Sequence, residues 1–356
     1  MQVVIVGAGL GGIACGIACR RQGLDVTILE RAPELSEIGA GIQVPPNACR
    51  ALDYIGVLDK IKGKATEILV RHLRRWDNGD ILATRKYGSV SYEKYGYPAM
   101  VIHRADLQRT LIETAEELGA QIRTGCDVSK ADFEATEVVL SNGEHVKADV
   151  ILGADGIWST LRSQVVGQSI EPTETGDLAY RGTFTRKQLE ELNDPEVLRF
   201  CEENKQTLTL WLGPLKHAQA FALLGDSAHP TLPYQSQGAA MAFNDAAVIG
   251  ALLGRFHQID KGQLEAKGMT LHKVLKIFEA GQKPYSSLNV QGAVKNRVMY
   301  HLPDGKAQQQ RDMEFSQMMA ESRSDWTWID GQYQKRIIGT DLVKVDLEKF
   351  DSELNK

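Results

Sequence analysis

The sequence predicts an α/β fold, in which a Rossmann-like dinucleotide-binding domain is combined with a smaller domain built on an antiparallel sheet. Three observations predict it. The chain opens with a strand, a glycine-rich loop, a helix and a second strand. Further short apolar runs then alternate with helical periodicity. After residue 173 the pattern changes to period-two alternation. The 356 residues suffice for one large domain and a smaller one.

Each element follows from its local pattern. Short apolar runs predict strands at residues 2–6, 26–30, 121–123, 137–140 and 150–152. Apolar residues at helical spacing predict helices at residues 11–22, 101–119 and 158–166. The alternating runs LAYRGTF and TLTLWLG between residues 173 and 212 predict the start of the antiparallel domain. Residues 223–254 read as strand, loop and a long alanine-rich helix, and the chain after residue 271 reads as polar helix.

Composition and charge exclude several classes of function. Hydrophobic residues make up 43% and charged residues 24% of the chain, as in soluble globular proteins. A net charge of −5 gives no basic field for nucleic acid, and we interpret the run Arg71, Arg74 and Arg75 as a solvated face. No uninterrupted apolar stretch approaches about 18 residues, and no signal-peptide pattern opens the chain. We therefore expect a cytoplasmic protein without a membrane span.

The five cysteines argue against both a disulfide framework and a zinc site. Their number is odd, and no two of them form a CxxC pair. Cys15 and Cys19 share one face of the first predicted helix, where we interpret them as small core residues. His103 and His301 have no partners at metal-ligand spacing, so we predict no metal.

The opening loop carries a dinucleotide-binding fingerprint. Gly7, Gly9 and Gly12 form GAGLGG between strand and helix, and Glu30 closes the second strand about twenty residues on. The glycines permit a tight turn, close approach of a pyrophosphate and helix–strand packing, while the helix N-terminus offers free N–H donors. Glu30 can accept hydrogen bonds from ribose hydroxyls, which favours FAD or NAD over NADP at this position.

Further motifs resemble those of the FAD-dependent aromatic hydroxylases, the group A flavoprotein monooxygenases, and of their salicylate hydroxylase-like members. The motifs are GAGIQVPPNA at residues 39–48, HRADL at 103–107, GADGIWSTLR at 153–162, LLGDSAHPTLPYQSQGAAMAFNDA at 223–246 and YHLPDG at 300–305. Their order along most of the chain is that of the family. The resemblance implies FAD as cofactor, with NADH or NADPH and O2 as co-substrates and a small-molecule substrate.

The resemblance also assigns flavin-site residues. Arg104 resembles an arginine near the pyrophosphate, with a surface ion pair as the alternative, and Asp155 resembles an aspartate of structural role. Asp226 follows an apolar strand, where its carboxylate can bind the ribityl hydroxyls or simply cap a turn. The remaining predicted cofactor-binding residues are Gly41 and Ile42 of the second motif, together with Pro233, Gly238 and Ala239. The last three precede or open a predicted helix, whose free N-terminal amides can face the O2 and N1 edge of the flavin.

The implied reaction is hydroxylation or epoxidation of a small aromatic or secondary-metabolite substrate through a flavin C4a-hydroperoxide. Arg181 resembles an arginine beside the substrate in several relatives, Tyr180 precedes it, and these two are the candidate catalytic residues. Two alternatives stay open. One is a flavin-binding relative with lost or uncoupled hydroxylation, an NAD(P)H oxidase or an inactive form. The other is a nonenzymatic partner protein that uses the Rossmann surface for interaction.

The domain boundaries follow from the motifs, with one departure from the family pattern. Residues 1–170 and 223–300 are predicted as the FAD-binding domain, 171–222 as a remnant of the antiparallel-sheet substrate domain, and 301–356 as a C-terminal helical tail. The interval from Trp211 to Gly225 is short where relatives have several strands. A gene-model error, a degenerate paralogue or a genuine minimal variant would explain this truncation. It should leave Leu208, Leu210 and Leu212 poorly covered and admit water to the site.

Overall fold

The computed structural model describes residues 1–35, 40–172, 184–212, 231–317, 324 and 326–355. The strands are β1 (Gln2–Val6), β2 (Asp25–Leu29), β3 (Gly41–Val44), β4 (Ala65–Glu67), β5 (Val70–Arg75), β6 (Ile81–Lys86), β7 (Met100–His103), β8 (Gln121–Arg123), β9 (Val128–Asp132), β10 (Glu137–Leu140), β11 (His145–Lys147), β12 (Val150–Gly153) and β13 (Thr207–Leu212). Strands thus cease after residue 212 in the described part of the chain.

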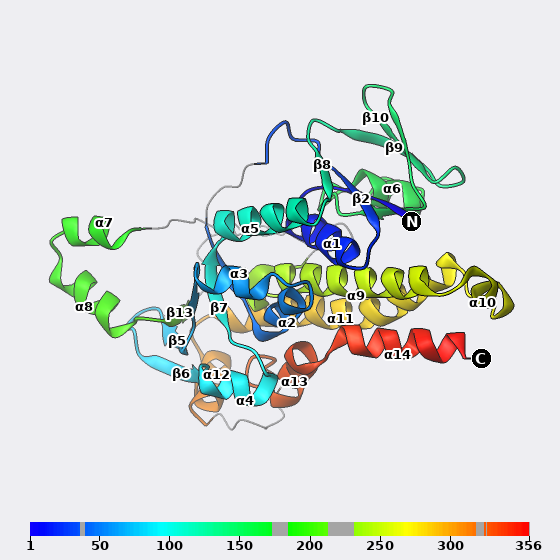
Figure 1. Cartoon of the computed structure of the whole chain (residues 1–356). Coiled ribbons are helices and arrows are strands. Elements are labelled where there is room, and N and C mark those ends of the chain that lie inside the picture. The colour runs from blue at the N-terminus through cyan, green and yellow to red at the C-terminus, as the bar shows by residue number, and fades with distance from the viewer. Residues whose placement is uncertain (36–39, 173–183, 213–230, 318–323, 325, 356) are drawn as a thin grey trace.

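Helices lie between many of the strands, and all regular elements after β13 in the described residues are helices. They are α1 (Leu10–Arg21), α2 (Pro46–Tyr54), α3 (Leu58–Lys62), α4 (Ser89–Tyr95), α5 (Arg104–Glu117), α6 (Thr160–Val166), α7 (Arg186–Glu191), α8 (Pro195–Glu203), the 3₁₀ helix η1 (Pro233–Gln235), α9 (Gly238–Gln258), α10 (Lys261–Ala266), α11 (Leu271–Tyr300), α12 (Lys306–Ser316), α13 (Gly331–Gly339) and α14 (Leu342–Leu354). Figure 1 shows α7 and α8 set apart from the rest of the molecule.

A parallel sheet in the order β12-β1-β2-β8 confirms the predicted βαβ opening. Val3, Val4 and Ile5 in β1 are fully buried, as expected of a central strand covered on both faces. The outer edge of β12 pairs with no strand among the residues that the structure describes. The order and parallel register of this sheet confirm the α/β fold class.

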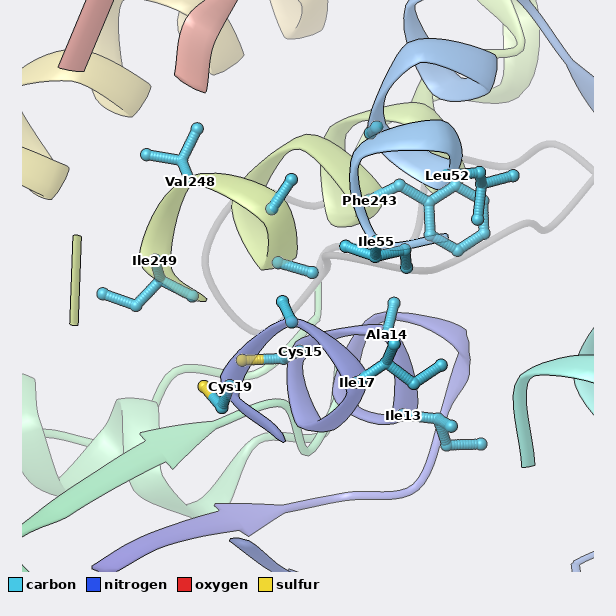
Figure 2. Close-up of a cluster of buried hydrophobic side chains, with 14 of the residues drawn as sticks. Ile13, Ala14, Cys15, Ile17, Cys19, Leu52, Ile55, Phe243, Val248 and Ile249 are labelled. Carbon is cyan, nitrogen blue, oxygen red and sulfur yellow. The ribbon is translucent and has the colours of Figure 1, made fainter. Parts of the chain in front are cut away.

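The core lies where α1 crosses α9. A Cβ on Gly250 would lie 2.5 Å from the Cβ of Ala18, so the absent side chain permits the close approach of the two helices. Figure 2 shows Phe243 of α9 lying beside Leu52 and Ile55. Cys15 and Cys19 are buried in this core as predicted. A hydrogen bond with Cys19 and burial raise the pKa of the Cys15 thiol, so it is an inert apolar group.

The predicted helix at residues 101–119 begins later than expected. Residues 100–103 form β7, which lies between β3 and β4, and the helix α5 starts at Arg104. The apolar residues of β7 happen to continue the helical spacing of those in α5, so the sequence pattern did not separate the two elements. Pairing of β7 with its two antiparallel neighbours decides the conformation there.

The sheet β13-β5-β6 combines both kinds of pairing. We predicted that the run TLTLWLG would begin an antiparallel domain, but β13 pairs parallel with β5, and only β5 and β6 are antiparallel. Leu212 is 2% exposed, which corrects the expectation that it would be poorly covered. It packs in another buried cluster with Met299 of α11, Phe315 of α12 and Trp328, which precedes α13.

In the described part of residues 301–356, the helices α12, α13 and α14 pack on the body. Phe350 of α14 is fully buried in the main core, and α14 contacts both α9 and α11. The helix α9 is long and apolar enough to cross a bilayer by composition, yet 78% of that window is buried inside the protein. It is therefore a core helix, and no other described helix meets the same length and composition test.

Candidate functional site

The glycine loop has the geometry that its sequence predicts. Gly7 has φ +106°, and a Cβ there would lie 2.3 Å from the carbonyl oxygen of Ala154. A Cβ on Gly12 would lie 1.9 Å from the carbonyl oxygen of Gly7. Gly9 is the N-cap of α1 and has no side chain that could satisfy the first N–H groups of the helix. The loop therefore presents backbone donors and the positive end of the helix dipole to an anion.

Glu30 lies beside this loop. Its Oε2 accepts a hydrogen bond from the Ala8 N–H at 2.8 Å, and its Oε1 accepts one from the Ala32 N–H at 2.9 Å. Both bonds fix the carboxylate at the mouth of the glycine turn, and each oxygen retains capacity to accept from a hydroxyl group. The structure thus brings together Glu30 and the fingerprint glycines, which are far apart in sequence.

Gly41 and Ile42 lie on β3 directly opposite His103 and Ile102 of β7. Arg104 follows β7 as the first residue of α5, and its N–H donates to the carbonyl of Ala40 at 2.9 Å. The antiparallel register is therefore what places Arg104 next to the second motif. Gly41 and Arg104 are about sixty residues apart in sequence, and this spacing alone does not predict that they lie close together.

Asp155 has a structural position at the start of α6. Its Oδ1 accepts from the Ser159 hydroxyl at 2.5 Å, and its Oδ2 accepts from the Leu161 N–H at 3.1 Å. A Cβ on Gly7 would also lie 3.1 Å from the Cα of Asp155, so this aspartate borders the glycine loop. Its contacts agree with the structural role that the resemblance implies.

Pro233 opens η1, and Gly238 and Ala239 are the first residues of α9. Gln237, the N-cap of α9, is held by a polar network that the sequence analysis missed. Asn47 Nδ2 donates to Gln237 Oε1 at 2.8 Å and to the Tyr285 hydroxyl at 3.0 Å, and that hydroxyl donates to the carbonyl of Ile337 at 2.9 Å. This network joins α2, α9, α11 and α13. Burial raises the pKa of the Tyr285 phenol, which stays protonated and able to donate.

Tyr180, Arg181 and Asp226 lie outside the described residues. Their predicted roles therefore stay predictions. The other predicted cofactor-binding residues fall into three groups, at the glycine loop, at the β3–β7 pair and at the N-terminus of α9.

A small cavity of about 40 Å³ borders the segment before α9. Its walls come from β3, β5, β6, η1, α11 and α13, with the aromatic rings of Tyr87, Tyr234, Tyr300 and Trp328 among the lining residues. Arg71 and Arg85 also line it, which corrects the interpretation of Arg71 as part of a solvated face. The alternation of β5 is the signal that was available, because Arg71 and the buried Leu73 are two residues apart and point to the same face.

The three groups fit an extended dinucleotide, which comprises a pyrophosphate, a ribose and a flavin ring. The glycine loop leaves no room for side chains where backbone must approach a ligand, and the carboxylate of Glu30 is fixed beside it. The N-terminus of α9 lies beside that of α1, because a Cβ on Gly11 would lie 3.2 Å from the Cβ of Ala242, and it also borders the cavity. No cluster of three or more metal-ligating side chains occurs in the described part of the chain.

The sequence of the chain matches a family described as FAD binding domain over residues 1–220. The chain therefore belongs to this family of FAD-binding flavoproteins. Its relatives include FAD-dependent monooxygenase OpS4 of Beauveria bassiana (strain ARSEF 2860), which is 30% identical over 407 aligned positions covering 92% of each chain. Another is 3-hydroxybenzoate 6-hydroxylase 1 of Aquipseudomonas alcaligenes, 29% identical over 71% of this chain and 81% of the relative.

Solved structures share the fold. A crystal structure of Klebsiella pneumoniae HpxO complexed with FAD and uric acid has a TM-score of 0.67, with 19% identity, and the match covers 95% of this chain and 97% of that one. The structure of FqzB has a TM-score of 0.72, with 18% identity, and covers 100% and 93%. The family match and the relative OpS4 confirm the predicted family, the FAD cofactor and the enzyme class, an FAD-dependent monooxygenase.

The comparison with OpS4 also bears on the short interval before the fourth motif. The alignment is 407 positions long, whereas the chain has 356 residues, so the relative contains residues without a counterpart here. This agrees with the predicted truncation.

Proposed function

We propose that this protein uses NADH or NADPH and O2 to hydroxylate or epoxidise a small aromatic or secondary-metabolite substrate. In a hydroxylation, substrate C–H, O2, NAD(P)H and a proton would give C–OH, water and NAD(P)⁺. The observation that supports it is the position of the aromatic-lined cavity, which borders Gln237 at the N-terminus of α9, where the flavin edge is expected. The names of the relatives agree with aromatic substrates.

Bound FAD would supply the electron transfer and oxygen activation. The residues of the chain would bind and orient it. The α1 N-terminus would hold the pyrophosphate, and Glu30 would accept from ribose hydroxyls. Free amides at Gly238 and Ala239 would donate to the flavin ring and stabilise negative charge on it.

The chain would also limit access of water to the cavity. Trp328, Ile337 and Ile338 form part of its wall, and all three are buried. Water exclusion matters because water promotes loss of activated oxygen as hydrogen peroxide. Tyr180 and Arg181 are proposed to contact the substrate on the strength of the family resemblance.

The second candidate function is NAD(P)H oxidation without hydroxylation. One observation favours it: the relative OpS4 contains residues without a counterpart in this chain. If strands that shield the site in relatives are missing, then oxygen would be reduced to peroxide.

The test starts with the visible absorption spectrum of the purified, desalted protein, before and after incubation with FAD. Bound flavin is expected. Oxidation of NADH and NADPH is then followed with and without a panel of small phenols and aromatic acids, while product and hydrogen peroxide are both quantified under ¹⁸O2. Substrate-stimulated oxidation with one ¹⁸O in the product supports the monooxygenase. Peroxide as the sole product supports the oxidase, and absence of flavin after reconstitution refutes both.

A further inference from the structure

We propose that Arg71 and Arg85 form the subsite for the carboxylate of an aromatic acid, so that an aromatic carboxylate is the substrate class. This inference rests on the proposed function and identifies the residues that would select its substrate.

The two arginines are placed as a pair by the sheet. Arg71 of β5 and Arg85 of β6 are direct cross-strand partners in the antiparallel register, as are Leu73 and Ala83 two residues further on. Leu73 and Ala83 are buried in the cluster with Trp328 and Tyr300. Because side chains alternate along a strand, Arg71 and Arg85 share this inner face. Both are only partly exposed, and both line the cavity.

Like charges directly opposite each other destabilise a sheet. An anion between or beside them removes that repulsion. In the described part of the chain, no carboxylate lies within ion-pair distance of either guanidinium. By contrast, Arg75 on the same strand pairs with Asp77, Asp304 and Asp312. The inner pair therefore carries two positive charges that the described residues leave uncompensated.

Neutral groups hold both guanidinium groups in place. Arg71 donates to Gln43 Oε1 at 2.5 Å and lies 5.7 Å from the ring centre of Tyr87. Arg85 donates to Gln334 Oε1 at 3.0 Å and to the carbonyl of Trp328, whose ring centre is 4.4 Å away. These contacts fix the orientation of the two guanidinium groups and do not neutralise their charge. Such preorganised donors favour bidentate binding of a carboxylate.

Further donors at the cavity also lack acceptors. The Nε of Arg71 and the indole Nε1 of Trp328 are buried without a hydrogen-bond partner in the described structure, and Trp328 is 2% exposed. Burial would raise the pKa of the Tyr87 phenol, but Arg71 and Arg85 outweigh it, and the net shift is downward. An excess of donors and a positive local field both indicate a ligand that accepts hydrogen bonds and carries negative charge.

The remaining walls indicate the rest of the ligand. Tyr234, Tyr300 and Met100 provide aromatic and apolar surface next to the arginines. The cavity of about 40 Å³ has room for a carboxylate-sized group, whereas a benzene ring fits a cavity of about 150 Å³. Binding of the ring therefore requires side chains to move, and Tyr234, which is only partly buried, borders the cavity on the side of η1.

The test compares benzoate with benzamide, a neutral molecule of nearly the same shape, by titration calorimetry on the full-length protein. Wild-type protein should bind benzoate at least 10-fold more tightly than benzamide. Arg71→Gln and Arg85→Gln should each weaken benzoate binding at least 10-fold and leave benzamide binding unchanged. Arg74→Gln is the matched control, because Arg74 lies on the opposite face of β5 and outside the cavity lining. The lysine variants Arg71→Lys and Arg85→Lys should retain part of the preference.

Several outcomes would overturn the proposal. These are equal binding of benzoate and benzamide, an equal loss in Arg74→Gln, or binding of acetate as tight as that of benzoate, which would mean an anion site only. Urea unfolding of each variant shows whether a loss reflects misfolding, and retention in the lysine variants then separates the charge from the packing. Calorimetry needs neither flavin nor turnover. Loss of the subsite is therefore distinguishable from failure of the proposed function, which the flavin spectrum reports.

Discussion

The glycine at position 12 offers a direct test of the proposed loop geometry, because α1 contains a matched control. In Gly12→Ala the new Cβ would lie 1.9 Å from the backbone carbonyl of Gly7 and 3.3 Å from the Cβ of Ala154. In Gly16→Ala the nearest atom is the Cδ1 of Ile28 at 2.7 Å, the end of a flexible side chain. Both substitutions replace glycine with alanine within the same helix.

The expected magnitudes follow from two opposing effects. Alanine favours the helix interior over glycine by about 1 kcal/mol in either variant. Overpacking costs about 1–3 kcal/mol, with the upper end expected where the obstacle is backbone. Gly12→Ala should therefore lower the free energy of unfolding by about 2 kcal/mol, whereas Gly16→Ala should stay within about 1 kcal/mol of wild type. Displacement of the loop should also weaken FAD binding about 10-fold or more, equivalent to about 1.4 kcal/mol.

Urea unfolding and a fluorescence titration with FAD measure the two quantities. A Gly12→Ala protein as stable as wild type, with unchanged FAD affinity, would refute the account of the loop. So would an equal loss of FAD affinity in Gly16→Ala, since the effect would then not depend on contact with the backbone of Gly7. The unfolding experiment can also be done on the apoprotein, because the predicted loss of stability does not depend on bound FAD.

Two further predictions concern buried tyrosines. Tyr285→Phe removes a buried hydroxyl that accepts from Asn47 at 3.0 Å and donates to the carbonyl of Ile337. Its free energy of unfolding in urea should therefore fall by about 1–3 kcal/mol. The control Tyr54→Phe, at a more exposed tyrosine, should leave the free energy of unfolding unchanged. Burial raises the pKa of Tyr300 to about 12, above the ordinary value of about 10 for tyrosine, so the folded state keeps the proton that the unfolded state releases. The stability from this group is complete below pH 10 and should fall by about 1.4 kcal/mol per pH unit as the pH rises toward 12. A Tyr300→Phe variant should show a shallower decline between those pH values, and an unchanged slope would contradict the assignment.

Local sequence determined the parts of this protein whose conformation depends on near neighbours. The strand–loop–helix of residues 2–21 follows from an apolar run, three glycines and a helical stretch, and the structure has it within about one residue. The fingerprint implies its own geometry, because only glycine allows φ +106° at position 7 and the close contact at position 12. The dinucleotide class and the family followed from the same kind of local pattern.

Tertiary structure alone decided which distant segments meet. The register of β3 with β7 places Arg104 beside Gly41, and the register of β5 with β6 places Arg71 opposite Arg85. Neither pairing is encoded in local spacing, because it depends on which strands the sheet brings together and on which face the core covers. The parallel pairing of β13 and the burial of Leu212 under C-terminal side chains were decided in the same way. Sequence thus predicted the glycine loop expected to bind the cofactor, whereas long-range packing determined the shape and charge of the cavity lined by Arg71 and Arg85.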